Sequence, residues 1–179
     1  MTDRHERYST GKKGEGQTWA YLREIGYIRP TAAQRKVIAE TFASQGIKIH
    51  TQEFDVVEAR HADKLKSVAA LSTVLHELSL FEVKSCGAGR KATVSAGFKS
   101  FGFTLTSKEK YNADTLGDRY RFIFFNLRTS THRVCRLQDF FCDNMARIYQ
   151  TWSVFIRQDL PELDGNTAGS QSTPDDDSA

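Results

Sequence analysis

Cysteine, proline and methionine are scarce in this sequence, and it contains no long apolar run. Of 179 residues, three are Cys, three are Pro and two are Met. Cys86, Cys135 and Cys142 form no C-x-x-C pair and have no histidine at zinc-finger spacing, which argues against a disulfide framework or a structural zinc site. We expect free thiols in a reducing cytoplasm.

The five histidines are scattered and none falls in an H-E-x-x-H motif, so histidine-ligated metal chemistry has no support in the sequence. The longest apolar runs, such as residues 122–125, are far shorter than the ~18 residues that a membrane span requires. The first 16 residues contain no apolar signal core. The sequence therefore predicts a soluble cytoplasmic protein with no membrane partner.

Charge is unevenly distributed along the chain. Its 25 Lys and Arg and 22 Asp and Glu give a net charge of +3. Residues 159–179 hold six of the acids and no Lys or Arg, so residues 1–158 carry 25 bases against 16 acids, a net charge of +9. The hydrophobic content of 39% is enough for one core. We predict a flexible basic arm at residues 1–14, one domain at 15–160 and a disordered acidic tail at 161–179.

Helical periodicity is expected in several segments. Apolar spacing predicts a helix over residues 17–25 that ends at Gly26, and a second over 31–44 that Thr31 caps. Thr106 or Ser107 can cap a short helix. Apolar residues at three- and four-residue steps predict a long amphipathic helix over 134–160, whose apolar face either packs on the core or forms a homodimer contact with Phe140 and Phe155.

Strand signals separate these helices. β-branched and aromatic residues predict one or two strands within residues 47–57 and further strands at 78–85 and 119–129. Residues 62–78 fit either a helix or a strand. The order of elements predicts a single domain of the α/β or α+β class.

The segment Phe81-Glu82-Val83-Lys84-Ser85 carries the strongest local signal. Because side chains alternate along a strand, Phe81 and Val83 are expected on one face of the sheet, and Glu82 and Lys84 on the other. Opposite charges on a buried or half-buried strand are costly unless something compensates them. A bound divalent cation and a phosphate would compensate both.

A second acid, Asp55, interrupts the apolar residues of an upstream strand. Two carboxylates from adjacent strands make a hard oxygen site that suits Mg²⁺, an ion that keeps several waters and binds substrate phosphate. A lysine beside it can orient or help to deprotonate an attacking water. The combination suits phosphodiester hydrolysis.

This pattern resembles the PD-(D/E)xK superfamily of restriction-endonuclease-like nucleases. The resemblance implies a restriction-endonuclease-like core, which is an α/β fold with an α+β mixed sheet flanked by helices. It also implies that Asp55 and Glu82 bind Mg²⁺ or Mn²⁺, that Lys84 is the catalytic lysine and that Glu15 is the additional acid of the first helix. Residues 103–127 also look like an uncharacterised group of these domains attached to bacterial helicases and restriction systems. A helicase or methyltransferase companion is therefore an implied partner.

The sequence departs from the family pattern in two ways. No proline precedes Asp55, and Asp55 and Glu82 are 27 positions apart. Either residues 60–78 form an insertion, or the second acid is one of three others, namely Glu53, Glu58 and Asp63. Each residue also has a purely structural alternative. Glu82 and Lys84 could form a solvated surface pair. Asp55 could be a strand-edge or turn residue, and Glu15 could favour a helix N-terminus by its charge.

Basic residues interspersed with Gly, Ser and aromatic residues are typical of surfaces that follow a phosphate backbone. The expected nucleic-acid contacts are Lys13, Ser85, Arg90, Lys91 and Lys99, although Ser85 could equally cap a turn. The predicted function is a metal-dependent DNA endonuclease of the restriction, repair or junction-processing type, with RNA left open as a substrate. The alternatives are a non-catalytic nucleic-acid-binding or partner-recruiting module on the same fold, and a regulatory protein whose acidic tail competes for the basic surface.

Overall fold

A computed structural model of the chain describes residues 15–86, 98 and 103–140. The chain divides into two compact units, Met1–Ala146 and Arg147–Ala179, and all described residues belong to the first. The predicted basic arm, most of the loop at 87–102 and the acidic tail lie outside the described residues. The structural account below therefore concerns one unit.

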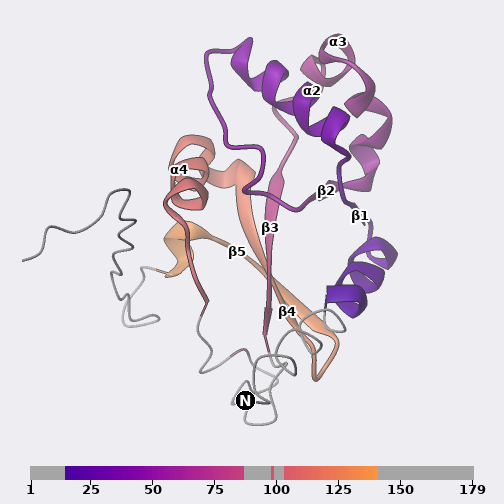
Figure 1. The fold of residues 1–179 in the computed structure, drawn as a ribbon, viewed down its shortest axis with the longest axis vertical. Helices are drawn as coiled ribbons and strands as arrows, with labels where there is room; N and C mark the ends of the chain where they lie inside the picture. Colours follow the sequence, from indigo (N-terminus) through magenta and orange to yellow (C-terminus); the bar gives the residue numbers. More distant parts are fainter. Residues whose placement is uncertain (1–14, 87–97, 99–102, 141–179) are drawn as a thin grey trace, which may run out of the picture. The chain divides into compact units, whose positions relative to one another are not determined.

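The described part of the chain forms a mixed five-stranded sheet in the order β1-β2-β3-β4-β5 (Figure 1). β3 and β4 are parallel, whereas the other neighbouring strands are antiparallel. A mixed sheet with helices agrees with the predicted α/β class. The strands are β1 (Tyr27–Ile28), β2 (Val56–Glu58), β3 (Leu80–Cys86), β4 (Tyr120–Asn126) and β5 (Thr131–Arg136).

Capping residues mark the ends of the helices. Residues 15–24 are helical, and Gly26 follows at a φ of 91°, a left-handed conformation that favours glycine after a helix end. Thr31 caps α2 (Ala32–Ala43) in a capping box with Gln34, as the sequence predicted. Thr106 caps α4 (Ser107–Leu116) in the same way with Glu109, which decides between Thr106 and Ser107.

The segment that fitted either a helix or a strand is helical. It contains a 3₁₀ helix at Ala59–Lys66 and then α3 (Val68–Ser72), which is separated from it by the extended residue Ser67. The Ser67 hydroxyl accepts a hydrogen bond from the Ala70 N–H and so caps α3. Two further 3₁₀ helices cover Gly117–Arg119 and Leu137–Phe140.

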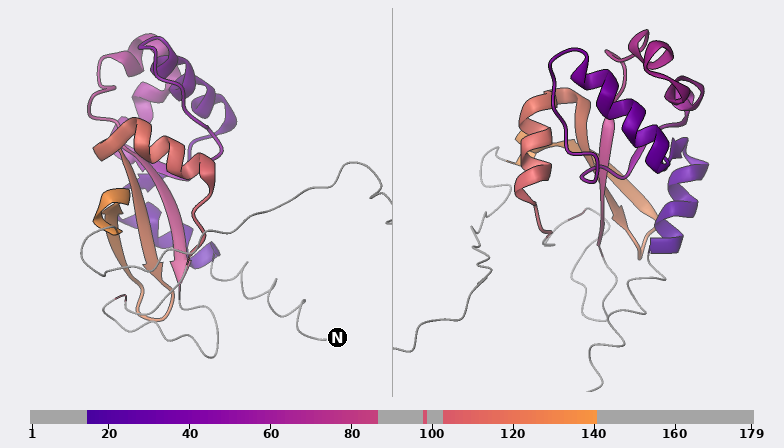
Figure 2. Two further views of the ribbon diagram at one scale, coloured as in Figure 1. Left: turned by 90° about the vertical axis from the view of Figure 1, so that its left-hand side faces the viewer. Right: turned by 45° about the horizontal axis from the view of Figure 1, so that its top comes forward.

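Two apolar clusters cover the two faces of the sheet. The larger cluster contains Phe42 of α2, Leu116 of α4 and Phe122 of β4, and the smaller one contains Leu22, Val56, Phe81 and Ile123. Figures 1 and 2 show α4 and the helix at residues 15–24 on opposite sides of the sheet. Leu80 packs in the larger cluster, so the pleat of β3 turns its even-numbered side chains toward the face that α4 covers.

The predicted helix over residues 134–160 is wrong in its first part. Residues 134–136 belong to β5, which pairs antiparallel with β4, with Val134 opposite Ile123. Ser130, at a φ of 51°, reverses the chain into this hairpin, and a 3₁₀ helix follows β5. Residues 134–136 thus pair with β4, and residues 137–140 form a 3₁₀ helix rather than part of a long α-helix. Residues 141–160, which include Phe155 of the predicted homodimer contact, lie outside the described residues.

Only part of the predicted strand region at 47–57 is a strand. Residues 47–55 reach β2 in irregular conformation, with Phe54 fully buried.

Among the helices of the described residues, none has both the length and the apolar content that a membrane crossing requires.

Candidate active site

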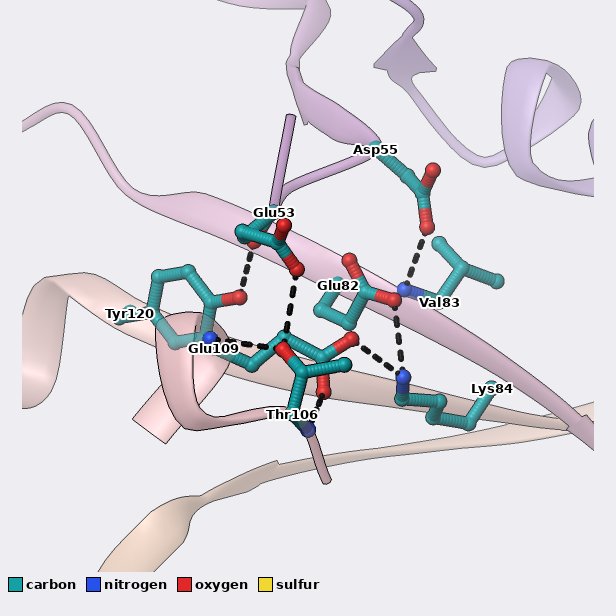
Figure 3. Close-up of polar contacts among 8 residues, drawn as sticks. All are labelled: Glu53, Asp55, Glu82, Val83, Lys84, Thr106, Glu109 and Tyr120. Atoms are coloured by element: carbon teal, nitrogen blue, oxygen red, sulfur yellow. Dashed lines mark hydrogen bonds and ion pairs between the residues drawn. The ribbon is translucent and has the colours of Figure 1, made fainter. Parts of the chain in front are cut away.

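Asp55 lies beside the middle of β3. β2 pairs antiparallel with β3, with Val56 opposite Phe81, and this register brings the residue before β2 next to Glu82 and Val83. The Asp55 N–H donates to the Phe81 carbonyl at 2.7 Å, and the Val83 N–H donates to Asp55 Oδ2 at 3.0 Å (Figure 3). The 3₁₀ helix and α3 span the long interval between the two acids, so two distant segments meet at one point of the sheet.

Glu82 and Lys84 share one face of β3, which confirms the prediction from side-chain alternation. Lys84 Nζ donates to Glu82 Oε1 at 3.0 Å, and only 12% of the Glu82 side chain and 17% of the Lys84 side chain are exposed. These two residues are therefore not the solvated surface pair that the sequence left open. Their charges are held close together in a largely buried environment.

A third carboxylate, that of Glu109, completes the surroundings of Lys84 (Figure 3). Lys84 Nζ donates to Glu109 Oε1 at 2.6 Å, and the Glu109 side chain is 5% exposed. Sequence reasoning missed Glu109. The signal was the T-x-x-E capping box at Thr106, which predicts a helix start but gives no indication that its glutamate faces a lysine on a distant strand.

The three alternative second acids bond to residues other than Glu82 and Lys84. Glu53 Oε2 accepts from the Thr106 hydroxyl at 3.0 Å, and the Tyr120 hydroxyl donates to the Glu53 main-chain carbonyl. Glu58 pairs with Arg60 at 2.8 Å, and Asp63, whose side chain is 90% exposed, pairs with Lys66 at 3.0 Å. Asp55 is therefore the acid that the fold places beside Glu82 and Lys84.

Arg35 of α2 holds the segment that carries Asp55, and sequence reasoning missed this residue as well. Its guanidinium donates to the main-chain carbonyls of Thr51 at 2.6 Å, of Phe54, and of Asp55 at 3.4 Å. It also lies 4.6 Å from the centre of the Phe54 ring. The planar fork of Arg35 thus supplies some of the bonds that fix the path of residues 47–55. Others come from Asn112, which bonds twice to the His50 main chain, and from the Asp55 N–H, which bonds to β3.

The two neighbouring carboxyls resist ionisation. Burial raises the pKa of Asp55, although the Val83 N–H and the charge of Arg35 oppose this effect. Burial, followed by the charge of Asp55, raises the pKa of Glu82 to about 8, even though Lys84 acts in the opposite direction. Near neutral pH, Glu82 therefore retains a proton for most of the time.

Lys84 remains an ammonium ion in this environment. Burial alone lowers the pKa of Lys84, but the hydrogen bonds and charges of Glu109 and Glu82 outweigh that effect and hold the pKa above its usual value. The positive charge of Lys84 is thus held between Glu82 and Glu109.

The other predicted site residues are not joined to this cluster. Glu15 has a side chain that is 55% exposed; it accepts from Trp19 Nε1 at 3.2 Å and lies 4.0 Å from Arg29. Ser85 Oγ lies 3.0 Å from the hydroxyl of Thr18, so this side chain faces the helix at residues 15–24. Among the described residues, no hydrogen bond or ion pair links Glu15 or Ser85 to the carboxylates or to Lys84. The remaining predicted contacts, Lys13, Arg90, Lys91 and Lys99, lie outside the described residues.

The chemistry of Asp55 and Glu82 fits a hard divalent cation that keeps most of its water. In residues 15–86, 98 and 103–140, no group of three or more His, Cys, Asp or Glu side chains is arranged to hold a metal ion. Two adjacent carboxyls are nevertheless a donor pair for a cation. Burial, and then the charge of Asp55, favours a proton on Glu82, and a bound cation can replace that proton. Mg²⁺ is often bound by only one or two carboxylates in proteins.

Comparison with models of protein families, with curated proteins and with solved structures found no match. The functional argument therefore rests on the geometry and electrostatics of the cluster itself.

Proposed function

We propose that this protein is a metal-dependent DNA endonuclease with a restriction-endonuclease-like core that hydrolyses phosphodiester bonds. One observation carries the proposal: Asp55, before β2, and Glu82 and Lys84, on β3, lie together although the two segments are distant in the sequence. A structural ion pair accounts for Glu82 and Lys84, but it does not explain a second buried carboxyl beside them. That extra acid raises the electrostatic cost of the site unless a cation binds there.

Asp55 and Glu82 would hold Mg²⁺ or Mn²⁺. The ion, when bound, would lower the pKa of an attacking water and neutralise charge on the phosphate. Asp55 is suited to this role because Val83 and Arg35 fix its carboxylate and its main chain, respectively. Glu82 is suited because its proton can be displaced when a cation arrives.

Lys84 would orient the attacking water or bind a phosphate oxygen. Its ammonium lies on the same face of β3 as Glu82 and has three N–H donors, two of which bond to Glu82 and Glu109. Because the pKa of Lys84 is raised by these partners, with burial opposing them, the side chain donates hydrogen bonds rather than accepting a proton. This supports an orienting and charge-neutralising role over that of a general base.

The proposed substrate is DNA, with RNA as the alternative polymer. The net charge of +9 over residues 1–158 favours a polyanion. Two buried carboxylates would repel the phosphates of a nucleic acid, so they would not help a protein that only binds the polymer. A homodimer and a helicase or methyltransferase companion remain predictions of the sequence.

The direct test is plasmid nicking. Wild type, Lys84→Ala and Lys110→Ala are incubated with supercoiled DNA and with structured RNA, in Mg²⁺, Mn²⁺ or EDTA. Lys110 is the matched control because its side chain is 54% exposed and forms an ion pair with Asp114 on the same helix. We expect metal-dependent nicking by wild type and Lys110→Ala, and loss of nicking in Lys84→Ala.

Equal nicking by wild type and Lys84→Ala would remove Lys84 from the mechanism. No nicking in any condition, together with salt-sensitive DNA binding, would instead support the non-catalytic nucleic-acid-binding module on the same fold. Cleavage of RNA alone would replace the proposed substrate class.

A further inference from the structure

Lys84 has two carboxylate partners that differ in their surroundings. Glu82 lies beside Asp55 and belongs to the pair that would take up a cation. Glu109 comes from α4 and is the more deeply buried of the two partners, with 5% of its side chain exposed against 12% for Glu82. The closer contact is also with Glu109, at 2.6 Å against 3.0 Å for Glu82.

We infer that Glu109 is a positioning residue that holds the Lys84 ammonium in the site while Glu82 is engaged by the cation. This inference rests on the proposed function. Without Glu109, the nearest fixed acceptor for Lys84 would be Glu82 itself, so the lysine and the cation would compete for one carboxylate. With Glu109 present, Lys84 keeps an acceptor whichever partner Glu82 has.

The orientation of Glu109 is fixed by the start of its own helix. Its Oε2 accepts from the Thr106 N–H at 2.8 Å, and its own N–H donates to the Thr106 hydroxyl at 3.0 Å. With Oε2 bound to the cap, Oε1 is directed at Lys84 (Figure 3). The capping box thus sets the direction of the carboxylate, since turning it away would break the bond to the Thr106 N–H.

The charges of the cluster also separate into two groups. With Glu109 as its nearer acceptor, Lys84 does not depend on Glu82 for a partner, so the negative charges of the Asp55 and Glu82 carboxylates can act on a divalent ion. If Lys84 had only Glu82 as a partner, it would cancel one of those charges and weaken the attraction for a divalent ion. Glu109 therefore both anchors the lysine and keeps the acid pair available.

A purely structural role for Glu109, as the second member of the capping box, predicts a different pattern of mutant effects. Thr106→Ala removes the hydroxyl cap but leaves the main-chain N–H that binds Glu109. Glu53→Gln changes the other carboxylate that contacts Thr106, and Glu53 has no bond to Lys84. Both variants disturb the helix start without removing the contact between Glu109 and Lys84.

The test measures the mobility of Lys84 by NMR of its ¹⁵N-labelled ammonium group, in the full chain without metal or nucleic acid. Wild type is compared with Glu109→Gln, Glu109→Asp, Glu82→Gln, Thr106→Ala and Glu53→Gln. We expect a restricted ammonium, with a high order parameter, in wild type, Thr106→Ala and Glu53→Gln, and also in Glu82→Gln, because Glu109 still holds the lysine there. Glu109→Gln should make the ammonium more mobile, since only the longer contact with Glu82 remains. Glu109→Asp keeps the charge and provides a second reading if Glu109→Gln fails to fold; its shorter side chain should also release Lys84.

Nicking is then measured on the same set. We expect Glu109→Gln to reduce kcat by roughly 10- to 100-fold with little change in KM, as for residues that orient a reacting group through another. Lys84 as rigid in both Glu109 variants as in wild type would overturn the inference, whether or not the protein cleaves DNA. Equal loosening by Thr106→Ala would overturn it too, because capping alone would then explain the effect. A mobile Lys84 in Glu109→Gln would support the positioning contact even if wild type cleaves nothing, an outcome that would count against the proposed function alone.

Discussion

The main-chain N–H of Val83 donates a hydrogen bond to Asp55 Oδ2 at 3.0 Å. Val83 stands between Glu82 and Lys84, so this bond fixes Asp55 beside the two residues of β3 that carry the charges. It also uses only one oxygen of Asp55, and among the described residues Oδ1 accepts no hydrogen bond. One carboxylate oxygen is therefore positioned by the sheet, and the other is available to a ligand.

Stability should fall as pH rises through the range in which Glu82 ionises. Burial and then Asp55 raise the pKa of Glu82 to about 8 in the folded state, above the usual value of 4.5, so folding favours the protonated form. The stabilisation from that proton is complete below the unfolded-state pKa and is lost as pH rises through the folded-state pKa. Urea unfolding between about pH 5 and pH 9 should show a decline of up to a few kcal/mol in wild type.

Glu82→Gln should flatten this decline, because the amide does not ionise. Glu40→Gln is the control, since Glu40 has a side chain that is 51% exposed on α2. A pH profile that Glu82→Gln leaves unchanged would show that Glu82 titrates normally.

Metal binding should release a proton from the acid pair. At about pH 7 Glu82 is mainly protonated, and a cation that binds its carboxylate must displace that proton. Calorimetric titration with Mg²⁺ or Mn²⁺, in buffers of different ionisation enthalpy, should detect up to about one proton released per ion bound. Asp55→Asn should weaken the binding of the metal ion. A heat of binding that is not accompanied by proton release would indicate that the ion binds at another place.

Loss of Lys84 should destabilise the fold by more than loss of an exposed lysine. Lys84→Ala leaves Glu82 and Glu109 without their shared cation, and breaking a buried ion pair costs about 3–5 kcal/mol. Lys110→Ala, which removes an exposed pair, should cost less than about 1 kcal/mol. Urea unfolding of the two variants measures the difference, and equal losses would contradict the electrostatic account.

Arg35→Met should impair the site in two ways, by releasing the segment that carries Asp55 and by removing a positive charge that favours the ionised form of Asp55. The substitution removes the donors that hold the carbonyls of Thr51, Phe54 and Asp55, and charged hydrogen bonds contribute about 1.5–3 kcal/mol each. We expect reduced stability and at least a roughly tenfold loss of nicking, since small misplacements of a reacting group are costly. Lys36→Met, on the exposed surface of the same helix, should leave both properties close to wild type.

Glu15→Gln should change cleavage by less than about threefold, because the described contacts of Glu15 are with Trp19 and Arg29 rather than with the acid pair. The measurement compares the rates of metal-dependent nicking by Glu15→Gln and by Glu82→Gln. A hundredfold loss in Glu15→Gln would return it to the role that the family resemblance implied.

Local rules were sufficient for part of the fold and the site. Alternation along a strand placed Glu82 and Lys84 on one face, and Thr31 and Gly26 marked helix ends, because pleat and caps depend on neighbouring residues alone. The same local reasoning failed at residues 134–136. Their apolar spacing also fitted a helix, and pairing with β4 decided the strand.

The sequence by itself thus determined the charged pair of β3, the helix caps and the apolar density that makes β4 a buried strand. The tertiary structure alone decided that Asp55, rather than Glu53, Glu58 or Asp63, stands beside that pair, because strand register sets that choice. It also decided that Glu109 and Arg35 belong to the site, since each comes from a helix whose packing on the sheet is non-local. Spacing along a chain specifies which side chains share a face, whereas contacts between distant segments depend on how the elements pack.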